Sequence, residues 1–95
     1  MKVVIKPSTN KEKKYMAIFY DGDKKVKITH FGQKKADDYT ITKNKEQRDR
    51  YRTRHKKDLD TKDPTRAGYL SWYILWNKPT LEASINNYKK KFNLT

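Results

Sequence analysis

The sequence predicts an α+β fold in which an antiparallel β-hairpin or three-stranded sheet packs against two to three α-helices. The N-terminal third alternates bulky apolar and polar residues, which is typical of strands, whereas the C-terminal half carries apolar residues at helical spacing. The length of 95 residues is enough for one domain and too short for two. We therefore expect a single small basic domain over residues 1–95, with the sheet within about 2–31 and helices over about 44–57, 66–76 and 80–92.

The expected sheet begins with a short edge strand at Val3–Lys6. The segment "KYMAIFY" (14–20) is rich in aromatic and bulky apolar residues and predicts a second strand, and Asp21-Gly22 is a typical hairpin turn. The segment "KVKITHF" (25–31) alternates cleanly, as a half-buried strand does. One face of this strand carries Val26, Ile28 and His30, and the other carries Lys25, Lys27 and Thr29. We expect the apolar face to cover the helices and the lysine face to be open.

Three helices are expected after the sheet. Asn44 with Gln47 three residues later favours a capped helix start, and this helix should reach about Lys57. The segment "AGYLSWYILW" (67–76) is apolar nearly all round, which indicates a central buried helix. Thr80 should cap the last helix, whose apolar face carries Leu81, Ile85, Tyr88 and Phe92.

Two polar segments connect these elements. The segment "QKKADDYTIT" (33–42) is expected to be a connector without helical structure, and "DLDTKDPT" (58–65) is expected to be a loop. Proline is tolerated in the first turn of a helix, so Asp63-Pro64 can open the central helix.

The charge balance points to an anionic partner. Lys and Arg number 24 against 11 Asp and Glu, for a formal net charge of +13. Such an excess is typical of nucleic-acid binders, and it also suits acidic protein surfaces or anionic lipid. The absence of cysteine excludes disulfides, zinc fingers and thiol catalysis. No apolar run is long enough for a signal peptide or membrane span, so we expect an intracellular protein that is not secreted and has no membrane partner.

The segment "RDRYRTRH" (48–55) places an arginine at every second position. Each step of two residues turns a helix by about 200°, so the four arginines cannot form one row on a helix. Two outward sectors are predicted, and they contain Arg48, Arg52 and Lys56 in one and Arg50 and Lys57 in the other. Two separated sectors favour contacts with the phosphate backbone over sequence-specific contacts with base edges in a groove. A solvated face without a ligand is the open alternative.

The third sector of this helix should face the domain. Tyr51 and His55 are its only bulky, partly apolar side chains, and a helix docks by such residues. Arg54 lies at the edge of the sector and is expected to pair with a carboxylate from Asp37, Asp38 or Asp63. Tyr51, Arg54 and His55 are therefore predicted to be structural.

The residues predicted to contact nucleic acid form two groups. The first is Arg48, Arg50, Arg52, Lys56 and Lys57, and the second is Lys25, Lys27, Lys34 and Lys35. They predict sequence-tolerant binding of nucleic acid, with DNA favoured over RNA.

No pattern in the chain predicts catalysis. His30 and His55 lack the cysteines or carboxylates that would make a metal site, and Glu12-Lys13-Lys14 contains only the short E-x-K half of a nuclease motif. No glycine-rich phosphate loop is present. Trp72 and Trp76 are four residues apart in an apolar helix, which favours a core position over base stacking. We expect no enzyme activity, no cofactor and no metal.

Several blocks carry a family resemblance: "KKYMAIF", "THFGQ", "DYT", "RDRYRTRH", "DP" and "LSWYILWNKPTLEASINNYKKKF". In this order, from about Lys13 to Phe92, they resemble an uncharacterised family of small basic proteins encoded by large nucleocytoplasmic DNA viruses (giant viruses). Family members often carry a histidine just after "DYT", where this chain has Ile41-Thr42. This departure argues against a shared histidine site.

The resemblance implies a setting and an architecture. The setting is the virion interior or the viral factory, where condensation or packaging of a viral genome would fit the charge. The alternative is a minor capsid or scaffold protein that binds acidic protein partners, and the oligomeric state stays open. The resemblance implies that a set of recurrent residues stabilises the fold: Phe31, Gly32, Tyr39, Tyr51, Arg54, His55, Leu75, Trp76, Asn77 and Pro79.

Overall fold

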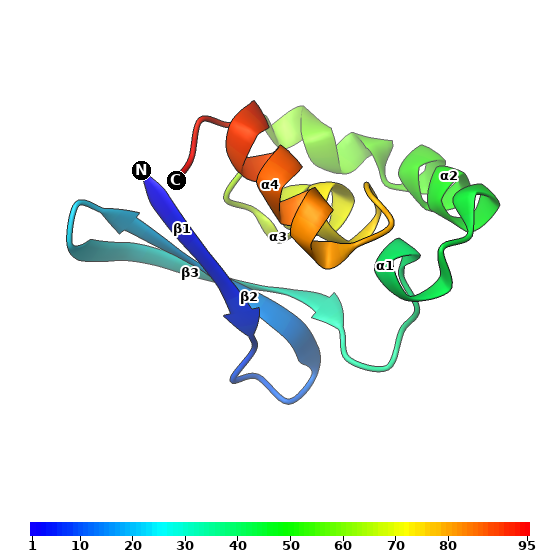
Figure 1. Cartoon of the computed structure of the whole chain (residues 1–95), viewed down its shortest axis with the longest axis horizontal. Helices are drawn as coiled ribbons and strands as arrows, with labels where there is room; N and C mark the ends of the chain where they lie inside the picture. Colours follow the sequence, from blue (N-terminus) through cyan, green and yellow to red (C-terminus); the bar gives the residue numbers. More distant parts are fainter.

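A three-stranded antiparallel sheet carries all helices on one of its sides in the computed structural model, which describes residues 1–95 (Figure 1). The strands are β1 (Lys2–Pro7), β2 (Lys13–Asp21) and β3 (Lys24–Gln33), and β2 is the central one. The predicted α+β class is confirmed. At the β2–β3 turn, Gly22 has a φ of +62°, the left-handed conformation that glycine adopts without strain.

The helix-covered face of the sheet is the one that carries Lys27, Thr29 and Phe31 of β3. Phe31 is fully buried in the core, and the Thr29 hydroxyl donates to the Thr65 carbonyl at 2.8 Å. Val26 and Ile28 lie on the open face and are 48% and 44% exposed. The predicted orientation of β3 is therefore wrong, although the alternation itself is present.

Cross-strand neighbours explain the reversed faces. Lys27 is paired with Phe19 and Phe31 with Tyr15, and paired residues of neighbouring strands point to the same side of the sheet. The central strand buries its large aromatic side chains against the helices, so Lys27 must follow Phe19 to that side.

Six helical segments follow the sheet. They are α1 (Tyr39–Thr42), α2 (Lys45–Arg54), the 3₁₀ helix η1 (Lys56–Thr61), α3 (Ala67–Leu70), the π-helical turn η2 (Ser71–Leu75) and α4 (Leu81–Lys91). Two segments expected to be loops are thus partly helical, because α1 falls within 33–42 and η1 extends into 58–65 as far as Thr61. The first long helix stops at Arg54, and the central helix begins at Ala67 and ends in a π-turn.

Side-chain caps define the helix starts. The Asn44 side chain accepts a hydrogen bond from the Gln47 amide at 3.0 Å, and Thr80 accepts one from the Ala83 amide at 3.2 Å. These bonds satisfy amides that have no partner within the helix. In α1, the missed helix, Asp38 has the same role and accepts from the Thr40 amide at 2.9 Å.

The core lies between the sheet and the helical elements α1, α3, η2 and α4. Val3, Ala17, Phe19 and Phe31 come from the strands. From the helices they meet Tyr39, Leu70, Ile74, Leu75, Trp76 and Tyr88. Trp72 is buried beside this cluster. Large rings supply much of the bulk of this small core.

Tyr88 gives the fold a predicted sensitivity to alkaline pH. Its hydroxyl donates to the Pro64 carbonyl, and burial, with a contribution from Asp63, raises the pKa of its phenol well above 10. Above pH 10 the unfolded chain ionises this tyrosine while the folded chain keeps the proton, so stability falls as pH rises. Tyr88→Phe should cost about 1 kcal/mol at neutral pH and should reduce this alkaline loss. Urea unfolding at pH 8 and pH 10.5 measures both, and an unchanged pH dependence in the variant would contradict the prediction.

Candidate nucleic-acid interface

Arg48 turns toward the body of the protein. One of its guanidinium nitrogens donates to the Asn77 carbonyl at 3.3 Å, and another pairs with Asp49 at 3.0 Å. The guanidinium also lies over the Tyr39 ring, 5.1 Å from its centroid. The prediction that Arg48 belongs to an outward sector is wrong.

Arg52 turns inward as well. Its Nη1 donates to the Trp76 carbonyl at 2.9 Å, and its guanidinium lies 4.5 Å from the centroid of the Trp72 ring. Burial lowers the pKa of Arg52, and the neighbouring Arg48 lowers it further. Both arginines bind carbonyls just beyond η2, where a helix end leaves acceptors without intrahelical partners. They therefore attach α2 to the central helix, and the predicted outward orientation of Arg52 is also wrong.

The remaining cations of the first predicted group are exposed. Arg50 on α2 and Lys56 and Lys57 on η1 form no ion pair and no hydrogen bond within the protein. They remain available to an anionic ligand.

Tyr51 and His55 face the domain, but Arg54 does not. The Tyr51 ring is stacked between His55 and Trp76, with centroid separations of 4.1 and 4.4 Å. Burial raises the pKa of Tyr51, and Asp58, which pairs with His55 at 3.3 Å, raises it further. Arg54 is exposed and has no carboxylate partner, so the expected ion pair is wrong.

Other cations occupy the expected partners of Arg54. Asp38 pairs with Lys14 at 2.6 Å, and Asp63 lies 4.0 Å from Lys27 and 3.6 Å from Arg66. Asp37 is exposed and unpaired.

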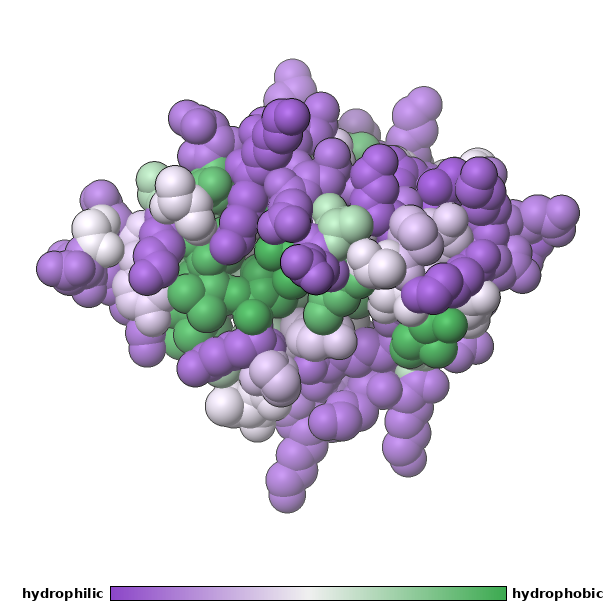
Figure 2. Space-filling view, in the orientation of Figure 1, coloured by the Kyte–Doolittle hydropathy of each residue, from purple (hydrophilic) through white to green (hydrophobic).

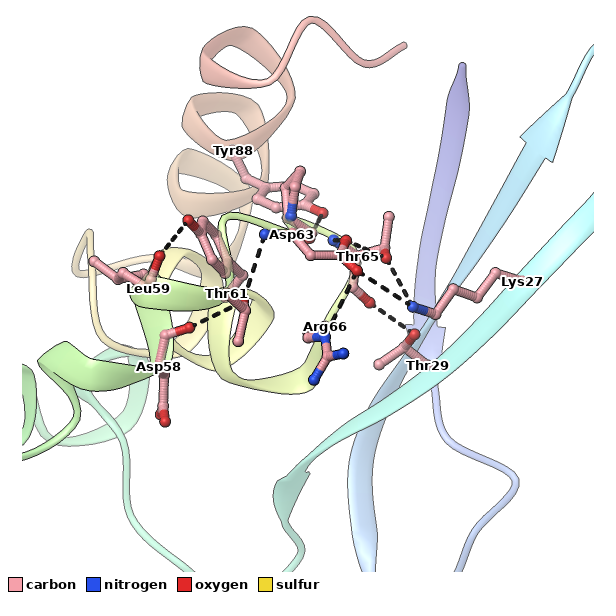
Figure 3. A network of polar contacts seen from close by, with 11 residues as sticks. Lys27, Thr29, Asp58, Leu59, Thr61, Asp63, Thr65, Arg66 and Tyr88 are labelled. Atoms are coloured by element: carbon pink, nitrogen blue, oxygen red, sulfur yellow. Dashed lines mark hydrogen bonds and ion pairs between the residues drawn. The ribbon is translucent and has the colours of Figure 1, made fainter.

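The second predicted group of lysines is divided along β3. Lys25 lies at the hairpin end and Lys34 just beyond the other end, a separation of about 30 Å at roughly 3.3 Å per residue. Lys27 is on the helix-covered side of the sheet, where its half-exposed side chain donates from Nζ to the Thr65 hydroxyl at 2.8 Å (Figure 3). Lys25, Lys27 and Lys34 therefore do not form one patch.

Lys34 and Lys35 instead lie beside Lys11, in the loop between β1 and β2, and Lys13, at the start of β2. A cleft of ≈ 620 Å³ is lined by Lys11, Lys13, Lys34 and Lys35, and we call it the basic groove. Glu12 is its only acidic lining residue, and none of the four lysines forms an ion pair. Pairing of Lys13 with Gln33 and a hydrogen bond from the Lys34 amide to the Glu12 carbonyl at 3.0 Å bring the two segments together.

Sequence reasoning missed Lys11 and Lys13 as site residues. They lie more than twenty positions from Lys34 in the chain, and only the antiparallel register makes them neighbours. Pairing the two predicted strands antiparallel about the Asp21-Gly22 turn would have placed Lys13 near Lys34.

A second cleft lies next to the basic groove. It has a volume of ≈ 610 Å³ and shares Lys13, Gln33 and Ala36 with the groove, and we call it the charged cavity. Its charged lining residues are Lys13, Lys14, Asp37, Asp38, Arg54, His55 and Asp58. Phe31, Tyr51, Leu75 and Trp76 also line it, and Tyr51 is the only one of these four that is not buried.

The ion pair between Lys14 and Asp38 is the most buried charged element of the charged cavity. Their side chains are 11% and 2% exposed, and Asp38 also accepts hydrogen bonds from Thr40. Removal of either partner would leave the other charge buried and unpaired, which is strongly destabilising. The pair therefore holds the segment around Asp38 against β2.

No three His, Cys, Asp or Glu side chains converge in a way that would hold a metal ion. None of the helices has the length and apolar character needed to cross a bilayer.

The fold and the two clefts define a small basic α+β protein with a lysine-lined groove. Residues 3–55 match the family described as "Family of unknown function (DUF5754)". Because this match covers more than half of the 95 residues, the chain belongs to that family. The matched range contains the sheet except Lys2, the four lysines of the basic groove and Arg54. No curated protein and no solved structure matches the chain.

Proposed function

We propose that this protein binds the phosphate backbone of nucleic acid without reading base sequence, and that the basic groove is its principal contact. The observation that carries the proposal is the convergence of four unpaired lysines, with one acidic neighbour, in a chain of net charge +13. Lysine is a compact point charge that suits phosphate but does not read base edges bidentately. Binding through such contacts is tolerant of sequence.

Further exposed cations extend the proposed interface. Arg54 lines the charged cavity next to the groove, and Arg50, Lys56 and Lys57 are unpaired on α2 and η1. Arg48 and Arg52 are left out of the interface because they bind carbonyls of the protein itself.

The setting of the proposed activity rests on the family resemblance. We place the protein in the virion interior or the viral factory of a large nucleocytoplasmic DNA virus, where it helps to condense or package the genome. DNA is then the expected ligand, and phosphate contacts of this kind suit a packaging role because they tolerate any sequence.

A salt titration tests this function. If the four groove lysines each neutralise one phosphate, log K for duplex DNA should fall with log salt at a slope of about −3.6. Gel-shift or anisotropy measurements between 50 and 200 mM salt give this slope. The proposal fails if duplex and single-stranded DNA both remain unbound at 50 mM salt.

The open face of the sheet favours a second candidate, a capsid or scaffold role with acidic protein partners. Val26 and Ile28 are exposed on this face, and Figure 2 shows an apolar area over the strands with hydrophilic side chains around it. An apolar centre with a basic rim suits a protein partner that is apolar in its centre and acidic at its edge. Such a contact should survive high salt if apolar area dominates it, whereas phosphate binding should not.

A further inference from the structure

We infer that the charged cavity receives one unpaired base of a nucleic-acid strand whose phosphates lie in the basic groove. This inference rests on the proposed function and names the form of nucleic acid that the site takes. The two clefts are adjacent and share the lining residues Lys13, Gln33 and Ala36, so one strand can reach both. The volume of ≈ 610 Å³ lies within the range of about 300–1,000 Å³ that is typical of pockets for small organic groups.

The two clefts differ in charge, and this difference indicates that phosphates bind in the basic groove and the base in the charged cavity. In the charged cavity Lys13, Lys14 and Arg54 are balanced by Asp37, Asp38 and Asp58. A phosphate placed there would meet carboxylates at close range. In the basic groove lysines outnumber the acidic residue four to one, which suits phosphate.

The polar groups of the charged cavity match the edges of a base. Base edges present both donors and acceptors, and carboxylates accept from exocyclic amino groups while arginine donates to ring and carbonyl acceptors. Asp58 and Arg54 supply these two functions on the cavity wall. Tyr51, which is partly exposed, and the exposed Ala67 supply apolar surface beside the ring.

The walls of the charged cavity contain a rare backbone form. Ser71 and Leu75, the first and last residues of the π-helical turn η2, both line it. π-helical turns are rare and occur frequently at functional sites. The turn is therefore a second observation, independent of the charges, that points to the same place.

Two glycines allow the walls to approach closely. Gly32 has a φ of +79°, and a Cβ atom there would lie 2.8 Å from Cδ1 of Leu75. A Cβ atom on Gly68 would lie 2.7 Å from Cβ of Asp58. Side chains at either position would displace Leu75 or Asp58, which both line the cavity.

A base can enter only when it is unpaired. The experiment therefore compares two fluorescein-labelled DNA strands of equal length, one intact and one with abasic sites, so that the phosphates are equal in number. The intact strand should bind about tenfold more tightly, the discrimination expected for one well-contacted base.

A variant that fills the cavity completes the test. Ala67→Phe places a ring at an exposed position that lines the charged cavity but not the basic groove. It should abolish the tenfold preference and leave the salt slope unchanged. Ala83→Phe, at an exposed position on α4 outside both clefts, is the matched control and should keep the preference. If Ala67→Phe fails to fold by circular dichroism, Ala36→Trp at the junction of the clefts replaces it.

The outcomes separate the two proposals. Salt-dependent binding with equal affinity for intact and abasic strands would overturn the base-binding inference and leave the proposed function standing. A preference that survives Ala67→Phe or Ala36→Trp would also overturn the inference, because the base would then bind elsewhere. The absence of binding to both strands at 50 mM salt would overturn the proposed function and the inference together.

Discussion

Replacement of the four lysines of the basic groove by glutamine should weaken DNA binding by about 10²- to 10³-fold at 0.1 M salt. The four positions are Lys11, Lys13, Lys34 and Lys35. Each phosphate contact to duplex DNA changes the salt slope by about 0.9, so the slope should become shallower by up to about 3.6. The four lysines form no ion pair, so their loss removes no partner of another charge. Anisotropy titrations at several salt concentrations measure the affinity and the slope.

A charge-matched variant separates geometry from net charge. Lys24, Lys25, Lys90 and Lys91 are exposed at the hairpin end and on α4, outside both clefts. Their replacement by glutamine removes the same four charges from the total of +13. If only the long-range field of the protein matters, both quadruple variants should lose affinity equally, and the groove would not be the interface. A loss concentrated in the groove variant supports the assignment.

Arg52→Ala should lower the free energy of unfolding by about 1–3 kcal/mol. The substitution removes a charge-assisted hydrogen bond to the Trp76 carbonyl and the stacking of the guanidinium on Trp72. It also removes one of the two arginine contacts between α2 and the end of the central helix. Urea unfolding followed by tryptophan fluorescence measures the change.

Arg50→Ala is the matched control, because it removes the same side chain two positions away on the same helix. Arg50 is exposed and unpaired, so its loss should change stability by less than about 0.5 kcal/mol. A stability loss of the same size in both variants would show that Arg52 has no special contact. A loss of DNA affinity in folded Arg52→Ala that exceeds the loss in Arg50→Ala would restore Arg52 to the interface.

Features that depend on neighbouring residues in the chain are predictable here. The Asn44–Gln47 cap, the Thr80 cap and the Asp21-Gly22 turn involve groups within three positions of each other, and all three are present. The apolar segment 67–76 lies in the core as its composition indicates. Such short-range patterns determine the kind and order of the elements, and from them the α+β class.

Which side of an element is buried is decided by the elements packed against it. The alternation in β3 predicts two faces, but pairing of Lys27 with Phe19 selects the buried one. The spacing of the arginines predicts their angles around α2, but the rotation of that helix is set by the Tyr51–Trp76 stack and by carbonyls at the end of η2. The side chains of Arg48 and Arg52 therefore point toward the body of the protein, and Arg54 has no ion-pair partner.

The fold class, the helix caps and the excess of positive charge can be predicted from local patterns in the chain. The place where that charge gathers depends on tertiary packing, because Lys11 and Lys13 meet Lys34 and Lys35 through strand register and a loop hydrogen bond. Capping and periodicity act over a few residues, whereas a binding groove forms between segments that sheet pairing and core packing bring together.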